Sequence, residues 1–254
     1  MVRQLRVLKE KVLWGGPRRE QVLLRLLEQH YESLFRRLWF YGREEPHYTN
    51  HRIGTFRFGF SGDANGPEYF YRGFFSSEML RKSDRVLDIG CGDGFFTKRF
   101  FSARCESVDG VDIEPSAIAE ASRFNSAPNV SYQLLDAVNR PFPRPPYHAV
   151  VWDGAIGHFA RADTEQMLQK IKRSMTADAV FVGSESLGRE EGHDHLQFFD
   201  SLKDLRDLFR PFWKHVQVRE VSYPLAHASF VRREGYWRCS DDHDRLRAAG
   251  WQTL

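Results

Sequence analysis

The sequence predicts an α/β protein with a doubly wound, seven-stranded and mostly parallel sheet. Two observations support this fold class. From about residue 84 onward, short apolar segments alternate with amphipathic ones, which is the pattern of consecutive β-α-β units. A glycine-rich turn directly follows the first apolar segment. The chain has 254 residues, which is enough for one large domain with an appendage.

The predicted strands and helices occupy most of the chain after residue 84. Apolar runs predict strands at residues 85–89, 107–112, 130–135, 148–152 and 179–183, followed by two antiparallel strands at 216–221 and 228–231. Helical spacing predicts helices at residues 97–101, 115–124, 163–175 and 201–209. Pro115 suits a first helical turn. Asp163 and Ser201 are the predicted N-terminal caps of the last two helices.

Residues 1 to about 80 are predicted to form a separate helical and aromatic cap, ahead of a second domain at 81–254. Residues 18–40 carry apolar side chains near helical spacing. Residues 47–73 are rich in Gly, Tyr and Phe and are too apolar for a linker. We therefore expect this segment to pack over the sheet as a lid.

Composition and charge exclude several classes of protein. Three cysteines are too few and too widely spaced for a secreted disulfide scaffold. No apolar stretch reaches the ~20 residues that span a bilayer, and Arg3, Arg6 and Lys9 interrupt any signal peptide. We expect a cytoplasmic protein without a membrane span. The net charge of +3 is too small to indicate nucleic acid, and the basic first 57 residues are interpreted as a solvated helix face.

The turn after the first strand carries the most informative motif. Counting from Gly90 or from Gly92, the third glycine of the dinucleotide fingerprint is replaced by Phe95 or Thr97, so that fingerprint fails. Asp88 would repel a pyrophosphate, whereas a carboxylate suits a ligand with an ammonium group. The pattern is D-x-G-x-G-x-G, in Asp88-Ile-Gly90-Cys91-Gly92-Asp93-Gly94-Phe95.

This motif resembles motif I of the class I S-adenosylmethionine-dependent methyltransferases, and the resemblance extends over about residues 84–222. It implies a methyltransferase with S-adenosylmethionine (SAM) as cofactor, bound within residues 81–254. In that family the glycine turn accommodates the methionine and ribose parts of SAM. The implied cofactor-binding residues are Asp88, Gly90, Cys91, Gly92, Gly94, Phe95, Asp112, Ile113, Asp136, Ala137, Asp153 and Arg72.

Four of these residues have particular roles under the resemblance. Asp112 ends the second strand, where an acid can accept two hydrogen bonds from ribose hydroxyls. Asp136 follows the third strand and is expected near the adenine amino group. Asp153 follows the fourth strand, whose end lines the methyl-transfer site. Arg72 precedes the sheet and can grip the cofactor carboxylate in two places; Arg52 is a weaker candidate for that contact.

Each role has a structural alternative. Asp112 could act only as a charge partner of the following helix. Asp109 competes with Asp112 for the ribose, but it lies too early in the strand. Asp136 could simply close a turn, and Asp153 could be structural. Arg72 could form an ordinary surface salt bridge.

The candidate catalytic residues are His158, His193 and Asp153. Methyl transfer is an in-line attack on the sulfonium methyl group, and a hydroxyl acceptor benefits from a base such as histidine. His158 lies just past the fourth strand and is preferred, while His193 follows the fifth strand with His195. A metal site at this His-x-His pair is not predicted, because such spacing on a loop is a weak ligand signal.

The favoured function is methylation of a hydroxyl, or of an amine, on a small-molecule or glycan-like acceptor. Trp152-Asp-Gly-Ala stands where amino-methylating nucleic-acid enzymes carry an N-P-P-Y tetrad. RNA methylation nevertheless stays an alternative, because Phe56, Phe58 and Phe60 interleave with basic residues. A second alternative is a catalytically silent SAM-binding partner subunit. NAD-dependent reduction is disfavoured by Phe95.

Overall fold

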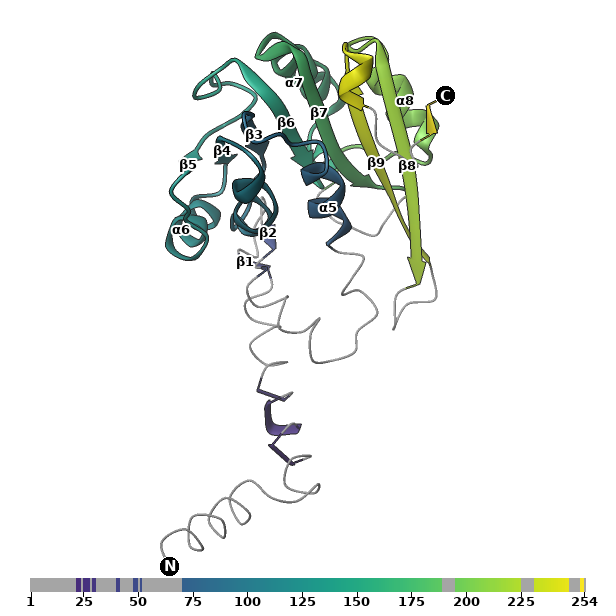
Figure 1. The fold of residues 1–254 in the computed structure, drawn as a ribbon. Coiled ribbons are helices and arrows are strands. Elements are labelled where there is room, and N and C mark those ends of the chain that lie inside the picture. Colours follow the sequence, from purple (N-terminus) through teal and green to yellow (C-terminus); the bar gives the residue numbers. More distant parts are fainter. Residues whose placement is uncertain are drawn as a thin grey trace, which may run out of the picture.

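In the computed structural model, the described residues are 70–188, 195–224, 231–246 and 252–253, with short pieces between residues 22 and 51. Most of them form one large sheet between two layers of helices (Figure 1). Its seven long strands are β3 (Arg85–Ile89), β4 (Ser107–Asp112), β5 (Val130–Leu134), β6 (Tyr147–Asp153), β7 (Met175–Ser186), β8 (His215–Pro224) and β9 (Val231–Ser240). The two-residue β10 (Gln252–Thr253) extends the edge.

The strand order is β10-β8-β9-β7-β6-β3-β4-β5. Strands β3 to β7 run parallel to one another, and β9 is antiparallel to both of its neighbours, β7 and β8. The predicted doubly wound, mostly parallel sheet is therefore confirmed. After β5 the chain returns past β3 and forms β6 on the other side of that strand. The strand order therefore reverses between β3 and β6, and open α/β sheets bind ligands at such a topological switch point.

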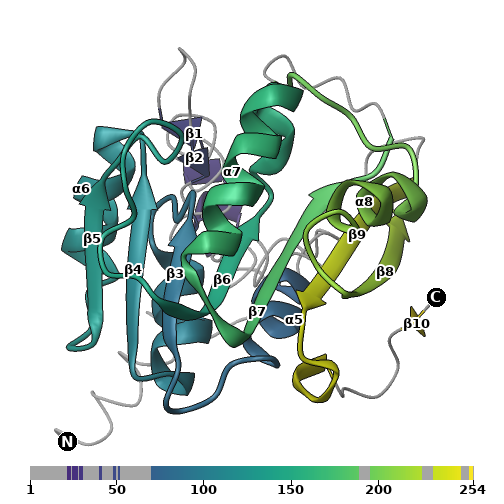
Figure 2. The ribbon, with the colours of Figure 1, turned by 90° about the horizontal axis from the view of Figure 1, so that it is seen from above.

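Helices cover both faces of the sheet. Figure 2 shows α7 (Arg161–Arg173) and α8 (Leu202–Phe209) in front of the sheet and α5 (Tyr71–Ser77) behind it. The remaining helical elements are α6 (Pro115–Phe124), the π-helix η1 (Thr97–Phe101) and the 3-10 helices η2 (Ser102–Arg104), η3 (Ile156–His158) and η4 (His243–Leu246). The helix expected at 97–101 is thus a π-helix, a form that often occurs near functional sites.

The central strands are buried on both faces because each face has its own apolar core. Leu87, Val150 and Phe181 pack with α7 and α8 on one face. Their neighbours Val86 and Val151 pack with η1 and η4 on the other face. Successive side chains of a strand point to opposite faces, so a strand that is covered twice is a continuous apolar run. This is why the sequence revealed these strands.

Several predicted boundaries were wrong, and two of them have a clear cause. The helix expected from Asp163 begins at Arg161 with Ala160 as its N-cap, and Asp163 lies in the first turn. The strand expected at 228–231 is β9, at Val231–Ser240. Its charged residues Glu234 and Arg238 hid it, since both are buried in ion pairs within the fold. By contrast, Ser201 is the N-cap of α8, as predicted, and it forms a capping box with Asp204.

Little of the predicted N-terminal cap lies within the described residues. Residues 22–23, 25–27 and 29–30 are helical, as expected, but Phe40–Tyr41 pairs with Tyr48–Thr49 as the strands β1 and β2. Most of the predicted lid at 47–73, including Arg52 and the three phenylalanines at 56, 58 and 60, lies outside the described residues. None of the helices in the described part is long and apolar enough to cross a bilayer.

Candidate functional site

The turn after β3 depends on glycine. Gly90, Gly92 and Gly94 have φ values of +70°, +53° and +72°, in the left-handed region that side chains disfavour. A Cβ on Gly94 would also lie 2.4 Å from the hydroxyl of Tyr132. The amide of Gly90 donates to the carbonyl of Val111 at 2.8 Å, which fastens the turn to β4. These contacts form a tight backbone turn at the carboxyl end of the central strand.

Asp88 lies beneath this turn and is only 4% exposed. One carboxylate oxygen accepts a hydrogen bond from the Thr97 hydroxyl of η1 at 2.5 Å. Burial raises the pKa of Asp88 to about 7, although the bond from Thr97 acts in the opposite direction. A cation placed beside Asp88 would therefore stabilise its ionised form. Cys91, in the same turn, is buried, and burial likewise raises the pKa of its thiol.

Asp112 joins the glycine turn to the end of β4. Its carboxylate accepts hydrogen bonds from the amides of Gly92 and Glu114, both at 2.9 Å. Burial raises the pKa of Asp112, and these bonds oppose that shift. The N-cap of α6 is Glu114. Next to Asp112, Ile113 is 53% exposed.

Asp109, the competitor of Asp112, serves the fold. It is buried in the middle of β4 and accepts hydrogen bonds from the guanidinium of Arg144. The Tyr147 hydroxyl donates a further bond at 3.0 Å. Its carboxylate is thereby held by two residues at the start of the β6 segment.

Asp136 closes its own turn after β5. It accepts from the amides of Val138 and Asn139 at 3.0 and 3.2 Å and from the Asn139 side chain at 2.7 Å. The side-chain bond from Asn139 is the main reason why the pKa of Asp136 is lowered. The amide of Leu135 donates to the carbonyl of Asp112 at 2.8 Å. Asp136 and Ala137 therefore lie in a loop joined to the end of β4.

A buried ionic cluster surrounds Asp153 at the end of β6. Asp153 accepts from the Ser76 hydroxyl of α5 at 3.0 Å, and burial raises its pKa to about 7 against the effect of Arg72. Arg72 binds Glu234 of β9 through Nε at 2.8 Å and Nη2 at 2.6 Å. A Cβ on Gly154 would lie 2.0 Å from Nη1 of Arg72. Arg72 thus sits between β9 and the turn after β6, and it forms no ordinary surface salt bridge.

Two histidines meet beyond the ends of β6 and β7. His158 is exposed at the end of η3, and its ring centroid lies 4.6 Å from that of His195, with perpendicular rings. The peptide of Gly157 holds the two segments together: its amide donates to buried Glu185 at 2.8 Å, and its carbonyl accepts from the Leu196 amide at 2.8 Å. His193 lies outside the described residues.

Phe95 belongs to an aromatic cluster rather than to an open pocket. It is 8% exposed and packs near Phe96 and Phe100. His51 stacks on Phe95 at 5.3 Å, and its ring binds the buried Asp93 at 2.8 Å. Residues before the sheet thereby contact the glycine turn.

Part of the chain is similar to a known protein family. A family described as a methyltransferase domain matches residues 86–178, from β3 into β7. This stretch contains the glycine turn, Asp112, Asp136, Asp153 and His158. Residues 86–178 therefore match a methyltransferase domain, and the fold is that of class I, SAM-dependent methyltransferases.

Solved structures show the same fold as this methyltransferase domain. The YcgJ protein of Bacillus subtilis has a TM-score of 0.56 at 18% identity, covering 67% of this chain and 97% of that protein. A SAM-dependent methyltransferase of Leishmania major has a TM-score of 0.54 at 18% identity, covering 68% and 74%.

Curated relatives are similar over shorter stretches. An eEF1A lysine and N-terminal methyltransferase of Xenopus laevis is 25% identical over 116 residues, which are 41% of this chain. An uncharacterized methyltransferase of Mycobacterium tuberculosis is 33% identical over 87 residues, covering 34% of this chain and 42% of the relative. The chain spans only 16% and 17% of the first two curated relatives, the Xenopus protein and its Drosophila melanogaster counterpart.

The methyltransferase site suits the charge of SAM, which carries an ammonium and a sulfonium group. Asp88 and Asp153 are acids at the ends of adjacent parallel strands, and burial raises the pKa of both. Oδ1 of Asp153 is buried without a hydrogen-bond partner among the described residues. Buried carboxylates of this kind are stabilised by a nearby cation. The residues present therefore fit this cofactor.

Sequence reasoning missed Glu185, Glu234 and Thr97. Glu185 stands between Ser184 and Ser186 at the polar end of an apolar strand, which is a usable signal for a site at a sheet edge. Thr97 is the first residue of η1, nine residues after Asp88, and its sequence position gave no sign that its hydroxyl binds that carboxylate. Glu234 had no local signal, because its partner Arg72 lies 162 residues earlier.

Proposed function

We propose that this domain transfers the methyl group of SAM to a hydroxyl, or to an amine, of a small-molecule or glycan-like acceptor. The observation that carries the proposal is the position of His158. It ends η3, five residues after Asp153 of β6, the strand next to β3, so a base lies at the same carboxyl edge of the sheet as the glycine turn. The three buried, unbridged cysteines support a cytoplasmic location.

The cofactor-binding roles follow the order of the strands. We assign the ammonium group of SAM to Asp88 and the ribose hydroxyls to Asp112, with Ile113 exposed beside it. The glycine turn lets the cofactor approach the backbone closely. Asp136 and Ala137 are assigned to the adenine through their loop, since the Asp136 carboxylate is already used by its own turn. Arg72 is assigned to the wall of the cofactor site near Gly154, because two of its nitrogens already bind Glu234.

The chemistry then needs little beyond positioning. Bound SAM supplies a sulfonium methyl group that an acceptor oxygen or nitrogen attacks in line. His158 accepts the proton of a hydroxyl acceptor, and the perpendicular His195 ring packs against the His158 ring. Glu185 holds the Gly157 peptide and thereby the spacing of both rings.

The test compares two pairs of histidines. His158→Ala is expected to lower turnover at least about hundredfold, the loss typical of a missing general base, and to leave S-adenosylhomocysteine (SAH) affinity within about twofold. Turnover is followed with radiolabelled SAM and cell-extract fractions, and affinity by calorimetry. His243→Ala is the control, because His243 pairs with His215 at a similar 5.2 Å but belongs to η4. Unaltered turnover in His158→Ala would remove the base assignment.

A protein amine is the second candidate acceptor. It is supported by the Xenopus relative, which is named as a lysine and N-terminal methyltransferase. The carboxylate of Asp153 and the buried carboxylates Glu185 and Glu234 also suit a cationic acceptor. Radiolabel that precipitates with protein would favour this acceptor, whereas label in the small-molecule fraction would favour the first. SAH binding without transfer to any fraction would favour the silent partner subunit.

A further inference from the structure

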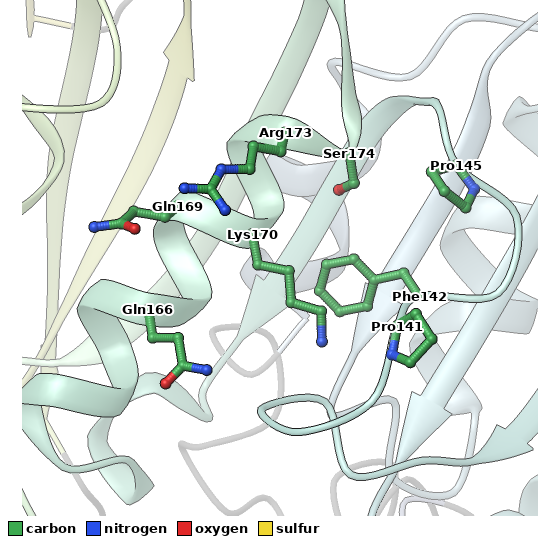
Figure 3. Close-up of a pocket in the computed structure, with 8 residues that line it drawn as sticks. All are labelled: Pro141, Phe142, Pro145, Gln166, Gln169, Lys170, Arg173 and Ser174. Atoms are coloured by element: carbon green, nitrogen blue, oxygen red, sulfur yellow. The ribbon is translucent and has the colours of Figure 1, made fainter.

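Lys170 of α7 reaches across to the loop that follows β5. Its ammonium donates a hydrogen bond to the carbonyl of Ala137 at 2.5 Å and another to the carbonyl of Arg140. Nζ also lies 4.4 Å from the centre of the Phe142 ring. Figure 3 shows the side chain extending from the helix toward Phe142 and Pro141.

These two carbonyls belong to one turn. Asp136 binds the amides of Val138 and Asn139 with its side chain, and its own carbonyl accepts from the amide of Arg140 at 3.0 Å. Hydrogen bonds within residues 136–140 therefore stabilise the turn, and the Lys170 ammonium of α7 adds two more bonds to it. An open hollow of about 350 Å³ lies beside Lys170, between α7 and Pro141, Phe142 and Pro145 (Figure 3).

The Lys170 side chain is partly buried at this contact. Burial lowers the pKa of Lys170, and the nearby Asp136 charge acts against this shift. Its two hydrogen bonds go to neutral carbonyls, although a charged donor is the stronger partner for a carboxylate. Such a group is useful where backbone carbonyls need a fixed direction.

We propose that Lys170 is a positioning residue for cofactor binding, which orients the 136–140 turn toward the adenine of SAM. The inference rests on the proposed function, which assigns Asp136 and Ala137 to the adenine. Because α7 begins three residues after His158, one helix would then align the adenine turn and the acceptor rim.

The experiment measures two ligands on three variants of the full chain. The ligands are SAH and S-inosylhomocysteine, which differ at the 6-position of the purine, where an oxo group replaces the amino group. Lys170→Met removes the charge and retains most of the apolar stem. Lys170→Arg retains the charge and the donors. Lys172→Met is the matched control, since Lys172 lies on the same helix and pairs with Asp241.

Lys170→Met is expected to bind SAH about tenfold more weakly, because it loses both charge-assisted hydrogen bonds that hold the binding loop. Its preference for SAH over S-inosylhomocysteine is expected to shrink, while Lys170→Arg and Lys172→Met retain that preference. Unchanged SAH affinity in Lys170→Met would overturn the inference. So would an equal loss for both ligands, because a residue that only stabilises the fold weakens both alike. A native chain that binds neither ligand would overturn the proposed function itself.

Discussion

The two sides of the site are assembled differently. On the glycine side, at the ends of β3, β4 and β5, the contacting residues are close in sequence: Asp88 and Thr97 are 9 residues apart, and Gly92 and Asp112 are 20 apart. On the histidine side, at the edge formed by β6, β7 and β9, Arg72 and Glu234 are 162 residues apart. A local motif builds the first side, whereas the second exists only when the whole sheet has formed.

The largest expected effect comes from a substitution that breaks the buried ion pair on the histidine side. Glu234→Gln leaves Arg72 and Arg232 facing a neutral group in a buried position, because Glu234 is only 1% exposed and both arginines lower its pKa. Removing one partner of a buried ion pair typically costs about 3–5 kcal/mol. We expect a loss of this size in the free energy of unfolding, measured by urea denaturation.

Glu220→Gln provides the matched control for this loss. Glu220 lies on β8 and also pairs with an arginine, Arg233, but both side chains are partly exposed. Such pairs contribute at most about 1 kcal/mol. Equal losses in the two variants would show that burial on the histidine side has no special importance.

A smaller effect is expected on the glycine side. Asp112→Ala removes the acceptor of two backbone hydrogen bonds and the proposed ribose contact. We expect SAH binding to weaken by about 1–3 kcal/mol, and a similar loss for Asp88→Ala. Asp178→Ala, at an exposed position of β7, serves as the control in calorimetry. SAH affinity that stays unchanged in both variants would contradict the cofactor assignment.

The smallest effect is a pH dependence of binding. Since the pKa of Asp88 is raised to about 7, its ionised fraction falls about tenfold between pH 8 and pH 6. If the ionised form holds the ammonium group, SAH affinity falls about tenfold over the same interval. Calorimetry at both pH values measures this change, and Asp88→Asn should flatten it. An SAH affinity of the native protein that does not change with pH would contradict the assignment of the ammonium group to Asp88.

The same two carboxyl groups determine in which direction the free energy of unfolding changes with pH. The folded pKa values of Asp88 and Asp153, about 7, lie above the ordinary value of 3.8, so the folded state binds more protons between these limits. Their contribution to the free energy of unfolding therefore falls as pH rises from about 4 to about 7. Adding SAH to the ligand-free protein should therefore raise its melting temperature more at pH 8 than at pH 6.

The sequence was informative where structure follows from short segments. Strands buried on both faces appear as apolar runs, and the glycine turn is one continuous motif, so β3, β4 and α6 were predicted to the residue. The charged strand β9 was misplaced because its charges are neutralised only by distant residues. Arg72 was noticed, but its partner Glu234 was not, since no periodicity joins α5 to β9.

On the proposed assignment, the two acids at the ends of β3 and β6 link the survival of the polypeptide to the supply of its cofactor. Without a positively charged ligand, Asp88 and Asp153 oppose folding near neutral pH. A ligand that binds only the folded form reduces the population open to proteases. Cells depleted of SAM and SAH should therefore degrade this protein faster than well-supplied cells do.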